Sequence, residues 1–350
     1  MTPKERIQCV LKGKTPDRVP FAPFSELIPR SELELRWRNQ GMGFLQHHSS
    51  VLQSSPVKQT VSFEGSRRAT FYHTDRGVVT DGFSYQQGAS NDGMVQTVFM
   101  IKEEADYEAA AAYIRSLEFA PETDFLSERY LGNEGVTHAW TGEPPYMDAQ
   151  YYLGLEKWCY DQEDCPELFE SLLQALGEMQ HKKLLCCLQA NEAMFNLGNL
   201  AGNFSPEKFK EKMVPYFAYY SDLLHKAGKK TTIHADASNL LEHKDLILPC
   251  GVDIVEAFTP PPFGNLSLAA AREAWGDGVT IIINFPESVF YGGYDETLRF
   301  TKELLESDPC PNKILSLTEM GFVGADDSNV RMIEEGIQAV LDGANAFGNY

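Results

Sequence analysis

Apolar and polar positions follow two different rhythms along the chain. From about residue 57 to residue 100, short alternating runs such as VKQTVSF, RRATFYHT and MVQTVFMI are separated by Gly and Asp turns, which is typical of β-hairpins. After about residue 102, helical spacing of apolar side chains predicts helices over 103–117, 149–161 and 165–185, with strands at 136–140 and 194–199. The alternating pattern of 57–100 predicts a hairpin insertion or lid. The pattern after residue 102 predicts alternating helices and strands.

The carboxyl-terminal half repeats a strand followed by a helix. A helix is predicted from Ser205 to Gly228, and four strand and helix pairs then follow at 231–236 with 239–249, 252–258 with 267–275, 279–285 with 295–306, and 313–319 with 328–343. This regular order predicts a parallel sheet wrapped by helices.

The amino terminus and the missing nucleotide fingerprint narrow the fold class. Thr2-Pro3-Lys4-Glu5 predicts a capped helix that runs to about Leu11, and 17–21 reads as a turn into a first short strand. No Gly-rich dinucleotide-binding motif follows the early strands. We therefore expect a distorted (β/α)8 TIM barrel with an amino-terminal β-hairpin insertion, and an open doubly wound sheet is the alternative.

Composition limits the possible partners. The chain has 350 residues, is 43% hydrophobic and carries a formal charge of −20, so a nucleic-acid backbone would be repelled. The sequence shows no apolar run of membrane-spanning length and no signal-peptide layout, which predicts a cytoplasmic protein. The seven cysteines form no CxxC pair that would clip a metal.

In a (β/α)8 barrel, the active-site residues lie where each strand ends and its following loop begins. That rule selects a set of polar side chains at the predicted strand ends: 140–143, 196–199, His234, Asp236, Glu256, Asn284 and Glu319. His234 and Asp236 are two positions apart, so they face the same side of a strand. An imidazole and several carboxylates meeting at one mouth are suited to a metal with nitrogen and oxygen ligands.

Each of these candidates also has a structural interpretation. His234 would otherwise bond to backbone, and Glu319 would otherwise form a loop salt bridge. Glu256 ends an apolar strand, so its carboxylate needs a metal, a proton or an arginine beside it. Aromatic side chains near the mouth suggest a flat, apolar substrate or cofactor, and Tyr146 is the first of them to test.

Two further groups of residues have simpler readings. The stiff run from Thr259 to Gly264 would form a wall of the pocket. His47, His48 and His73 lie in a stretch without clear periodicity, and we interpret them as surface residues.

Three segments have a sequence pattern typical of one superfamily: MTPKERIQCVLKGKTPDRVPF, GLEKWCYDQEDCPELFESLL and the block from Asn203 to Phe258. They resemble the uroporphyrinogen decarboxylase superfamily, in particular its methyltransferase-like branch. The similarity covers most of 1–40 and 135–345, whereas 45–130 match weakly. The resemblance implies a single barrel domain over 1–350, with 45–130 as an insertion or lid.

The resemblance implies either of two chemistries. One is cofactor-free decarboxylation of a tetrapyrrole, and the other is methyl transfer between a small methylated compound, a zinc-activated site and a corrinoid on a partner protein. The decarboxylases carry an arginine-rich amino-terminal signature, but 18–24 here read RVPFAPF with one arginine. A substrate with many carboxylates would also be disfavoured by the strongly negative chain.

The zinc methyltransferases carry His-x-Cys and a later cysteine, whereas this chain has His234-Ala235-Asp236 and, near the later position, Glu319. Carboxylates in place of thiolates imply a more Lewis-acidic metal that polarises an ether oxygen. The resemblance thus assigns His234 and Glu319 to the metal, with Glu256 or Asp236 completing the ligand set. Glu256 is alternatively a general acid.

The remaining roles follow from the same assignment. Glu256, Asp236 and Tyr146 are the catalytic candidates, and Asn199 and Asn284 are the cofactor-binding candidates. We expect a metal-dependent methyltransferase that passes a methyl group to a corrinoid on a partner protein. A tetrapyrrole decarboxylase, and a non-catalytic tetrapyrrole- or corrinoid-binding protein, are the alternatives; the chain is a possible homo-oligomer.

Overall fold

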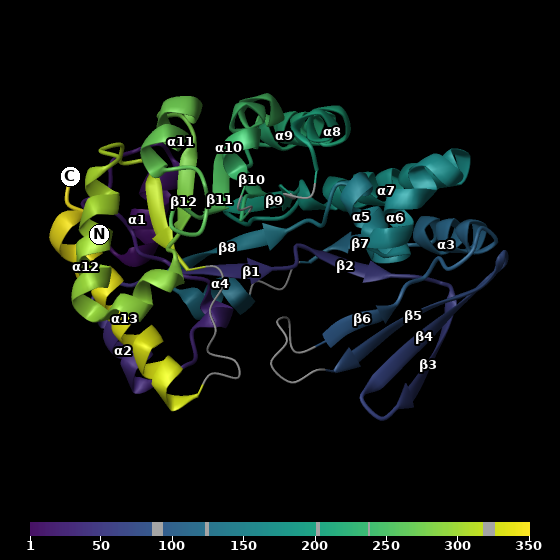
Figure 1. Cartoon of the computed structure of the whole chain (residues 1–350), viewed down its shortest axis with the longest axis horizontal. Coiled ribbons are helices and arrows are strands. Elements are labelled where there is room, and N and C mark those ends of the chain that lie inside the picture. Colours follow the sequence, from purple (N-terminus) through teal and green to yellow (C-terminus); the bar gives the residue numbers. More distant parts are fainter. Residues whose placement is uncertain (86–93, 123–125, 201–203, 237–238, 318–325) are drawn as a thin grey trace. The chain divides into compact units, whose positions relative to one another are not determined.

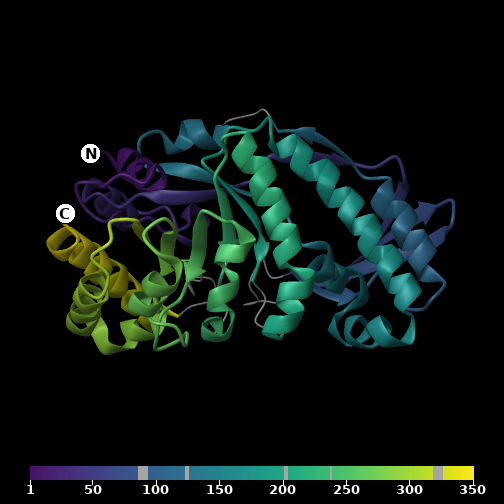
Figure 2. The same cartoon turned by 90° about the horizontal axis from the view of Figure 1, so that it is seen from above.

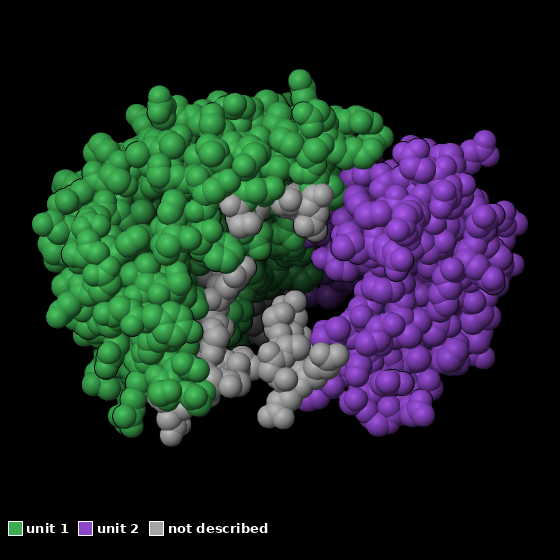
Figure 3. Space-filling model, in the orientation of Figure 1, with its two compact units in different colours: residues 1–49, 123–141, 191–350 green, residues 50–122, 142–190 purple. Residues whose placement is uncertain are grey.

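The chain forms two compact units (Figure 3). The computed structural model describes residues 1–85, 94–122, 126–200, 204–236, 239–317 and 326–350. Unit 1 comprises 1–49, 123–141 and 191–350, and unit 2 comprises 50–122 and 142–190. Unit 2 thus overlaps the predicted insertion 45–130 and also includes a later helical stretch.

Unit 1 is built on a curled, seven-stranded parallel sheet (Figure 1). Its strands are, in spatial order, β1 (Phe44–His48), β8 (Gly135–Trp140), β9 (Met194–Asn199), β10 (Thr231–His234), β11 (Ile254–Phe258), β12 (Thr280–Asn284) and β13 (Lys313–Ser316). The spatial order follows the chain without reversal, whereas a doubly wound sheet reverses at a switch point. The parallel α/β prediction is confirmed, and the doubly wound alternative is excluded. The interpretation of residues 44–48 as irregular was wrong.

Most helices of unit 1 lie along the outer side of the strands (Figure 2). The helices in the described part of this unit are α1 (Pro3–Leu11), α2 (Glu32–Asn39), α4 (Leu126–Leu131), α8 (Pro206–Lys212), α9 (Val214–Lys226), α10 (Leu240–His243), α11 (Leu268–Trp275), α12 (Gly293–Glu306) and α13 (Asp327–Phe347). The helix predicted over 205–228 is broken at Met213, because Pro215 has no N–H to continue the helical ladder. The helix predicted over 239–249 ends after one turn and continues as two short 3-10 turns, the second of which contains Pro249.

An extended segment at residues 18–24 hydrogen-bonds to both edge strands of the sheet. The amide of Ala22 donates to the carbonyl of Leu315 in β13 at 2.8 Å, and the amide of Leu45 in β1 donates to the carbonyl of Pro23 at 3.0 Å. The first short strand predicted near here is present only as isolated bridges. Pro20 and Pro23 lack amide donors, so this segment cannot form a regular ladder.

Helix α1 covers one end of the space inside the sheet. Thr2 and Glu5 form the predicted capping box, which fixes where this helix starts. The apolar side of α1 packs against one inward-facing residue from most of the strands. We call this set the apolar floor: Ile7, Val10 and Leu11 of α1 with Leu45, Val136, Met194, Ile254, Ile282 and Ile314.

The described residues of unit 2 form two antiparallel sheets and four helices. The strands β3 (Lys58–Glu64), β4 (Arg67–Thr74), β5 (Gly77–Tyr85) and β6 (Met94–Val98) pair in chain order, and β2 (Val51–Ser54) pairs with β7 (Glu118–Pro121). The helices are α3 (Asp106–Arg115), α5 (Pro145–Leu153), α6 (Leu155–Asp164) and α7 (Pro166–Cys187). The helix predicted over 149–161 is split at Gly154, whose φ of 76° lies outside the helical region. No helix in the described part of either unit is long and apolar enough to cross a membrane.

Shortening one side chain of the apolar floor tests its contribution to stability. Ile282 is fully buried, so Ile282→Ala should lower the free energy of unfolding by about 3 kcal/mol through lost burial and an unfilled cavity. Urea denaturation followed by circular dichroism measures this change. Leu35→Ala is the control, because Leu35 is 46% exposed, and it should change stability by less than about 0.5 kcal/mol. Equal losses in both variants would contradict the assignment of Ile282 to the floor.

Candidate active site

A layer of polar side chains lies two residues beyond the apolar floor on the strands of unit 1. Strand alternation places residues two apart on the same face, one step nearer the carboxyl end. We call this set the polar layer: His47, His138, Asn196, His234, Glu256, Asn284 and Ser316. The sheet therefore changes from apolar to polar toward the end where parallel α/β folds place their chemistry.

A short hydrogen bond joins His234 and Glu256 within this layer. The two residues are register neighbours on the parallel strands β10 and β11. Nδ1 of His234 lies 2.5 Å from Oε2 of Glu256, and the Nδ2 of Asn196 donates to the same oxygen at 3.4 Å. On the other side of the ring, Nε2 of His234 lies 3.5 Å from Oδ2 of Asp236. The structure thus brings His234, Asp236 and Glu256 together.

The positive charge of His234 and the negative charge of Glu256 stabilise each other. Glu256 has no solvent-exposed surface, and burial alone would raise its pKa, but the positive charge and hydrogen bond of His234 lower it. Burial would lower the pKa of His234, but Glu256 and Asp236 raise it well above its usual value. The pair therefore favours an imidazolium beside a carboxylate at neutral pH.

The backbone next to Glu256 departs from regular strand geometry. Ala257 has a φ of 55°, a left-handed conformation that is unfavourable for a residue with a Cβ. The pairing of β11 with β12 shifts register between Val255 and Phe258, which is the behaviour of a β-bulge. Bulges redirect the side chains beside them, and strained backbone of this kind is concentrated at functional sites.

Two histidines that the sequence analysis did not select extend the polar layer. His138 is fully buried, and its Nε2 lies 3.1 Å from Oγ1 of Thr232; burial lowers the pKa of His138 to about 4. The ring of His47 stacks on Phe24 at 4.1 Å and lies 5.4 Å from the His138 ring, centroid to centroid. Nδ1 of His47 pairs with Glu26. The alternation of His138 with Trp140 on an apolar strand was the signal that could have identified His138.

The three amino-terminal histidines differ in exposure. His47 and His73 are exposed, as predicted. His48 is not a surface residue, because its side chain is only 12% exposed and pairs with Glu192 at 2.8 Å.

Two residues of the polar layer each have a buried side-chain atom without a hydrogen-bond partner in the described structure. These atoms are Oε1 of Glu256 and Nδ1 of His138. Buried polar atoms in folded proteins are normally satisfied by protein or water. Both atoms are therefore candidate contact points for a bound water or a polar atom of a ligand.

The described residues do not complete the predicted zinc site. Two ligands of a tetrahedral zinc ion lie about 3.4 Å apart, so a 2.5 Å contact is too short for His234 Nδ1 and Glu256 to share one. Nε2 of His234 and Asp236, at 3.5 Å, have a suitable separation, and Glu256 then has the geometry of a carboxylate that orients a ligand histidine. No group of three His, Cys, Asp or Glu side chains in the described residues is placed to hold a metal, and Glu319 lies outside them.

The other predicted site residues occupy separate positions. Asn284 at the end of β12 donates to Oγ1 of Thr259 at 2.9 Å, and Asn199 ends β9 as the register neighbour of His234. Tyr146 belongs to unit 2, where it is buried, donates to Gln162 at 2.6 Å and packs edge-on against Trp158. A catalytic role for Tyr146 stays a prediction.

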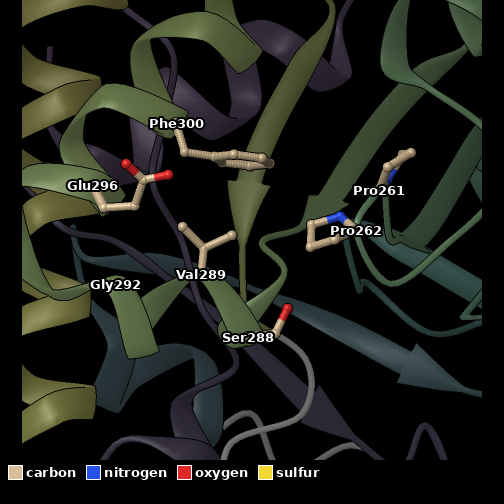
Figure 4. A pocket seen from close by; sticks show the side chains of 7 residues that line it. All are labelled: Pro261, Pro262, Ser288, Val289, Gly292, Glu296 and Phe300. Carbon is tan, nitrogen blue, oxygen red and sulfur yellow. The ribbon is translucent and has the colours of Figure 1, made fainter.

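The proline-rich loop after β11 lines an open cavity of about 520 Å³ (Figure 4). Pro261 and Pro262 form one side of it, and residues after β12 and on α12 form the other, including Ser288, Val289 and Phe300. Because these residues follow β11 and β12, the cavity belongs to the same edge of the sheet as His234 and Glu256. Its lining is mostly apolar.

Comparison with known proteins supports the fold. No family model matches the chain, and no curated protein matches it. A solved methyltransferase from Methanosarcina mazei is similar to it with a TM-score of 0.58 and 14% identity over 99% of both chains. A B12-independent methionine synthase from a Shewanella species has a TM-score of 0.43 and 9% identity over 93% of this chain and 96% of the other. The chain therefore has the fold of a solved methyltransferase.

Removing the charge of Glu256 tests the pairing with His234. Because the folded-state pKa of His234 lies above its usual value of 6.5, the charged ring stabilises the fold fully below that value. This contribution is lost as the pH rises through the folded-state pKa. Glu256→Gln should lower the pKa of His234 and remove much of this contribution, which NMR titration of the ring from about pH 5 to about pH 9 would measure.

The matched control for this titration is Glu303→Gln, which removes an exposed carboxylate on α12. It should leave the titration of His234 unchanged. A wild-type His234 that titrates at or below its usual value would contradict the pairing, as would an equal response to both variants.

Proposed function

We propose that this chain is an enzyme that transfers a methyl group from a small methylated donor to a corrinoid carried by a partner protein. The observation that supports this best is the hydrogen-bonded pair of His234 and Glu256 at the carboxyl ends of neighbouring parallel strands. A positioned acid at this place activates a poor leaving group, such as the oxygen of a methyl ether. The shared fold with a solved methyltransferase is consistent with this chemistry.

In the proposed reaction, the bond between the methyl carbon and the donor oxygen breaks. The methyl group passes to the reduced cobalt of the corrinoid, which is the second substrate and supplies the electron pair. The electron pair of the broken bond stays on the oxygen, and Nε2 of His234 gives that oxygen a proton. His234 then regains a proton from water, so atoms and charges balance.

The residues around His234 have supporting roles in this scheme. Glu256 holds the ring through Nδ1 and stabilises its charge, while Asn196 holds the same carboxylate oxygen. Asp236 faces Nε2, and its carboxylate orients the proton that is transferred. The apolar cavity beside Pro261 and Val289 would receive the part of the donor that carries no methyl group. Asn199 and Asn284 stay proposed contacts of the corrinoid.

Zinc is a second route to the same activation. The ion would use Nε2 of His234 and Asp236, whose separation of 3.5 Å suits two ligands of one ion, together with Glu319. When bound, it would polarise the donor oxygen in place of a proton. In that case Glu256 keeps the same task, because it orients the ring through Nδ1.

The local charges favour methyl transfer over decarboxylation of a tetrapyrrole. The acidic groups of the site are Glu26, Asp236 and Glu256, and a substrate with many carboxylates would be repelled by them. A non-catalytic binding protein has no need for a buried, charged pair that is costly to desolvate. We also propose that segment 18–24 replaces an eighth strand, so that the sheet closes as a distorted barrel.

A methyl-transfer assay with free reduced cobalamin tests the proposal. Purified protein is incubated with a panel of methylated aromatics and amines, and methylcobalamin formation is followed by absorbance. His234→Gln should lower the rate about 10²- to 10⁴-fold, because the proton donor is lost. His225→Gln is the control, since His225 is an exposed histidine paired with Asp253 on the surface, and it should retain the wild-type rate.

Metal analysis separates the two routes. A rate that survives chelation and a protein that purifies without zinc support the acid route. A rate that is lost on chelation and restored by zinc supports the metal route. A rate that is equal in wild type and in His234→Gln, or release of carbon dioxide from a porphyrinogen, would overturn the proposal.

A further inference from the structure

Strand β3 of unit 2 forms a free edge of its antiparallel sheet (Figure 1). It pairs with β4 on one side, and no other described strand pairs with it. All seven of its residues, KQTVSFE, are exposed. An exposed edge strand presents backbone donors and acceptors that another strand can use.

The hairpin between β3 and β4 decides which backbone groups point outward. Glu64 pairs with Arg67 across a two-residue turn, so this closing pair uses its backbone groups within the hairpin. Hydrogen-bonded pairs alternate with open ones along an antiparallel ladder. The amides and carbonyls of Gln59, Val61 and Phe63 therefore point to the free edge.

The order of charges along β3 suits pairing with a second copy of itself. An antiparallel match centred on Val61 places Lys58 opposite Glu64 of the other copy at both ends. It also places the outward-pointing Gln59 opposite the outward-pointing Phe63, and Val61 opposite its own copy. In this one register, Lys58 and Glu64 pair at both ends and about six backbone hydrogen bonds form between the two strands. The arrangement is two-fold symmetric.

Apolar side chains on the strand add to this match. Val61 is 52% exposed and Phe63 is 75% exposed, and they share one face of β3 because they are two residues apart. On the neighbouring strand β4, their partners are Thr70 and Arg68. Thr70 is buried but Arg68 is exposed, so this face is covered at Thr70 of β4 and is open over β3. Pairing two copies would bring the two valines together and would place each phenylalanine beside Gln59 and diagonal to Val61 of the other copy.

We propose that the chain forms a two-fold dimer through antiparallel pairing of β3 with β3 of a second copy. The two four-stranded sheets then continue as one eight-stranded sheet across the contact. This proposal is independent of methyl transfer, because it uses residues of unit 2 alone.

Sedimentation-velocity analysis of the full chain tests the contact. Because one strand pair is a small interface, concentrations from about 1 µM to about 100 µM cover the expected range. Wild type should change from monomer to dimer across this range. Val61→Pro removes an outward-pointing amide that β4 does not use, so it should abolish the dimer while the hairpin persists.

A charge exchange tests the register itself. Lys58→Glu places two acidic side chains opposite each other at both ends, which should weaken the dimer about tenfold. The double variant Lys58→Glu with Glu64→Lys should restore it. The proposal is overturned if wild type stays monomeric over the whole range, if Val61→Pro stays dimeric, or if the double variant is no tighter than the single one. Circular dichroism of each variant verifies folding.

Discussion

A carboxylate that is shielded from water needs a positive partner, and the site in unit 1 is organised by that requirement. Glu256 is fully buried in the middle of the apolar strand β11, and its partner His234 is the register neighbour on β10. Parallel pairing alone brings the two side chains together, because the register of β10 and β11 matches His234 with Glu256. Asn196 from the next strand along binds the same oxygen. The chemistry of the site thus depends on the register of three strands.

Much of the fold could be predicted from the sequence because its signals are local. The capping box of α1 and the repeated strand and helix order are encoded within a few residues of each element, and both are present. His234 and Glu256 could also be predicted as site residues, because each follows a short apolar run in the sequence. Strand ends of a parallel sheet meet at one edge, so such residues come together without any knowledge of the loops.

The parts that escaped prediction depend on partners distant in the chain. Strand β1 has a mixed pattern, FLQHH, because part of it faces the polar layer, and its partner β8 follows about ninety residues later. Without that partner, the sequence did not indicate that the exposed His47 lies beside His138 in the polar layer. Helices over 142–190 belong to unit 2 with strands from 50–122, and an amphipathic helix does not reveal which sheet it will cover. Glu319 lies outside the described residues, so its role stays a prediction.

The apolar floor closes one end of the site with described residues of α1 and the strands. Because α1 and the inward-facing aliphatic side chains fill the space beneath the polar layer, a reactant cannot reach the site through the floor. Two reactants that meet at His234 would then both enter from the end opposite the apolar floor. The product bound nearer the floor would leave only after the product bound nearer that end. An enzyme with this architecture is expected to follow an ordered kinetic sequence, in which the smaller molecule enters first and leaves last.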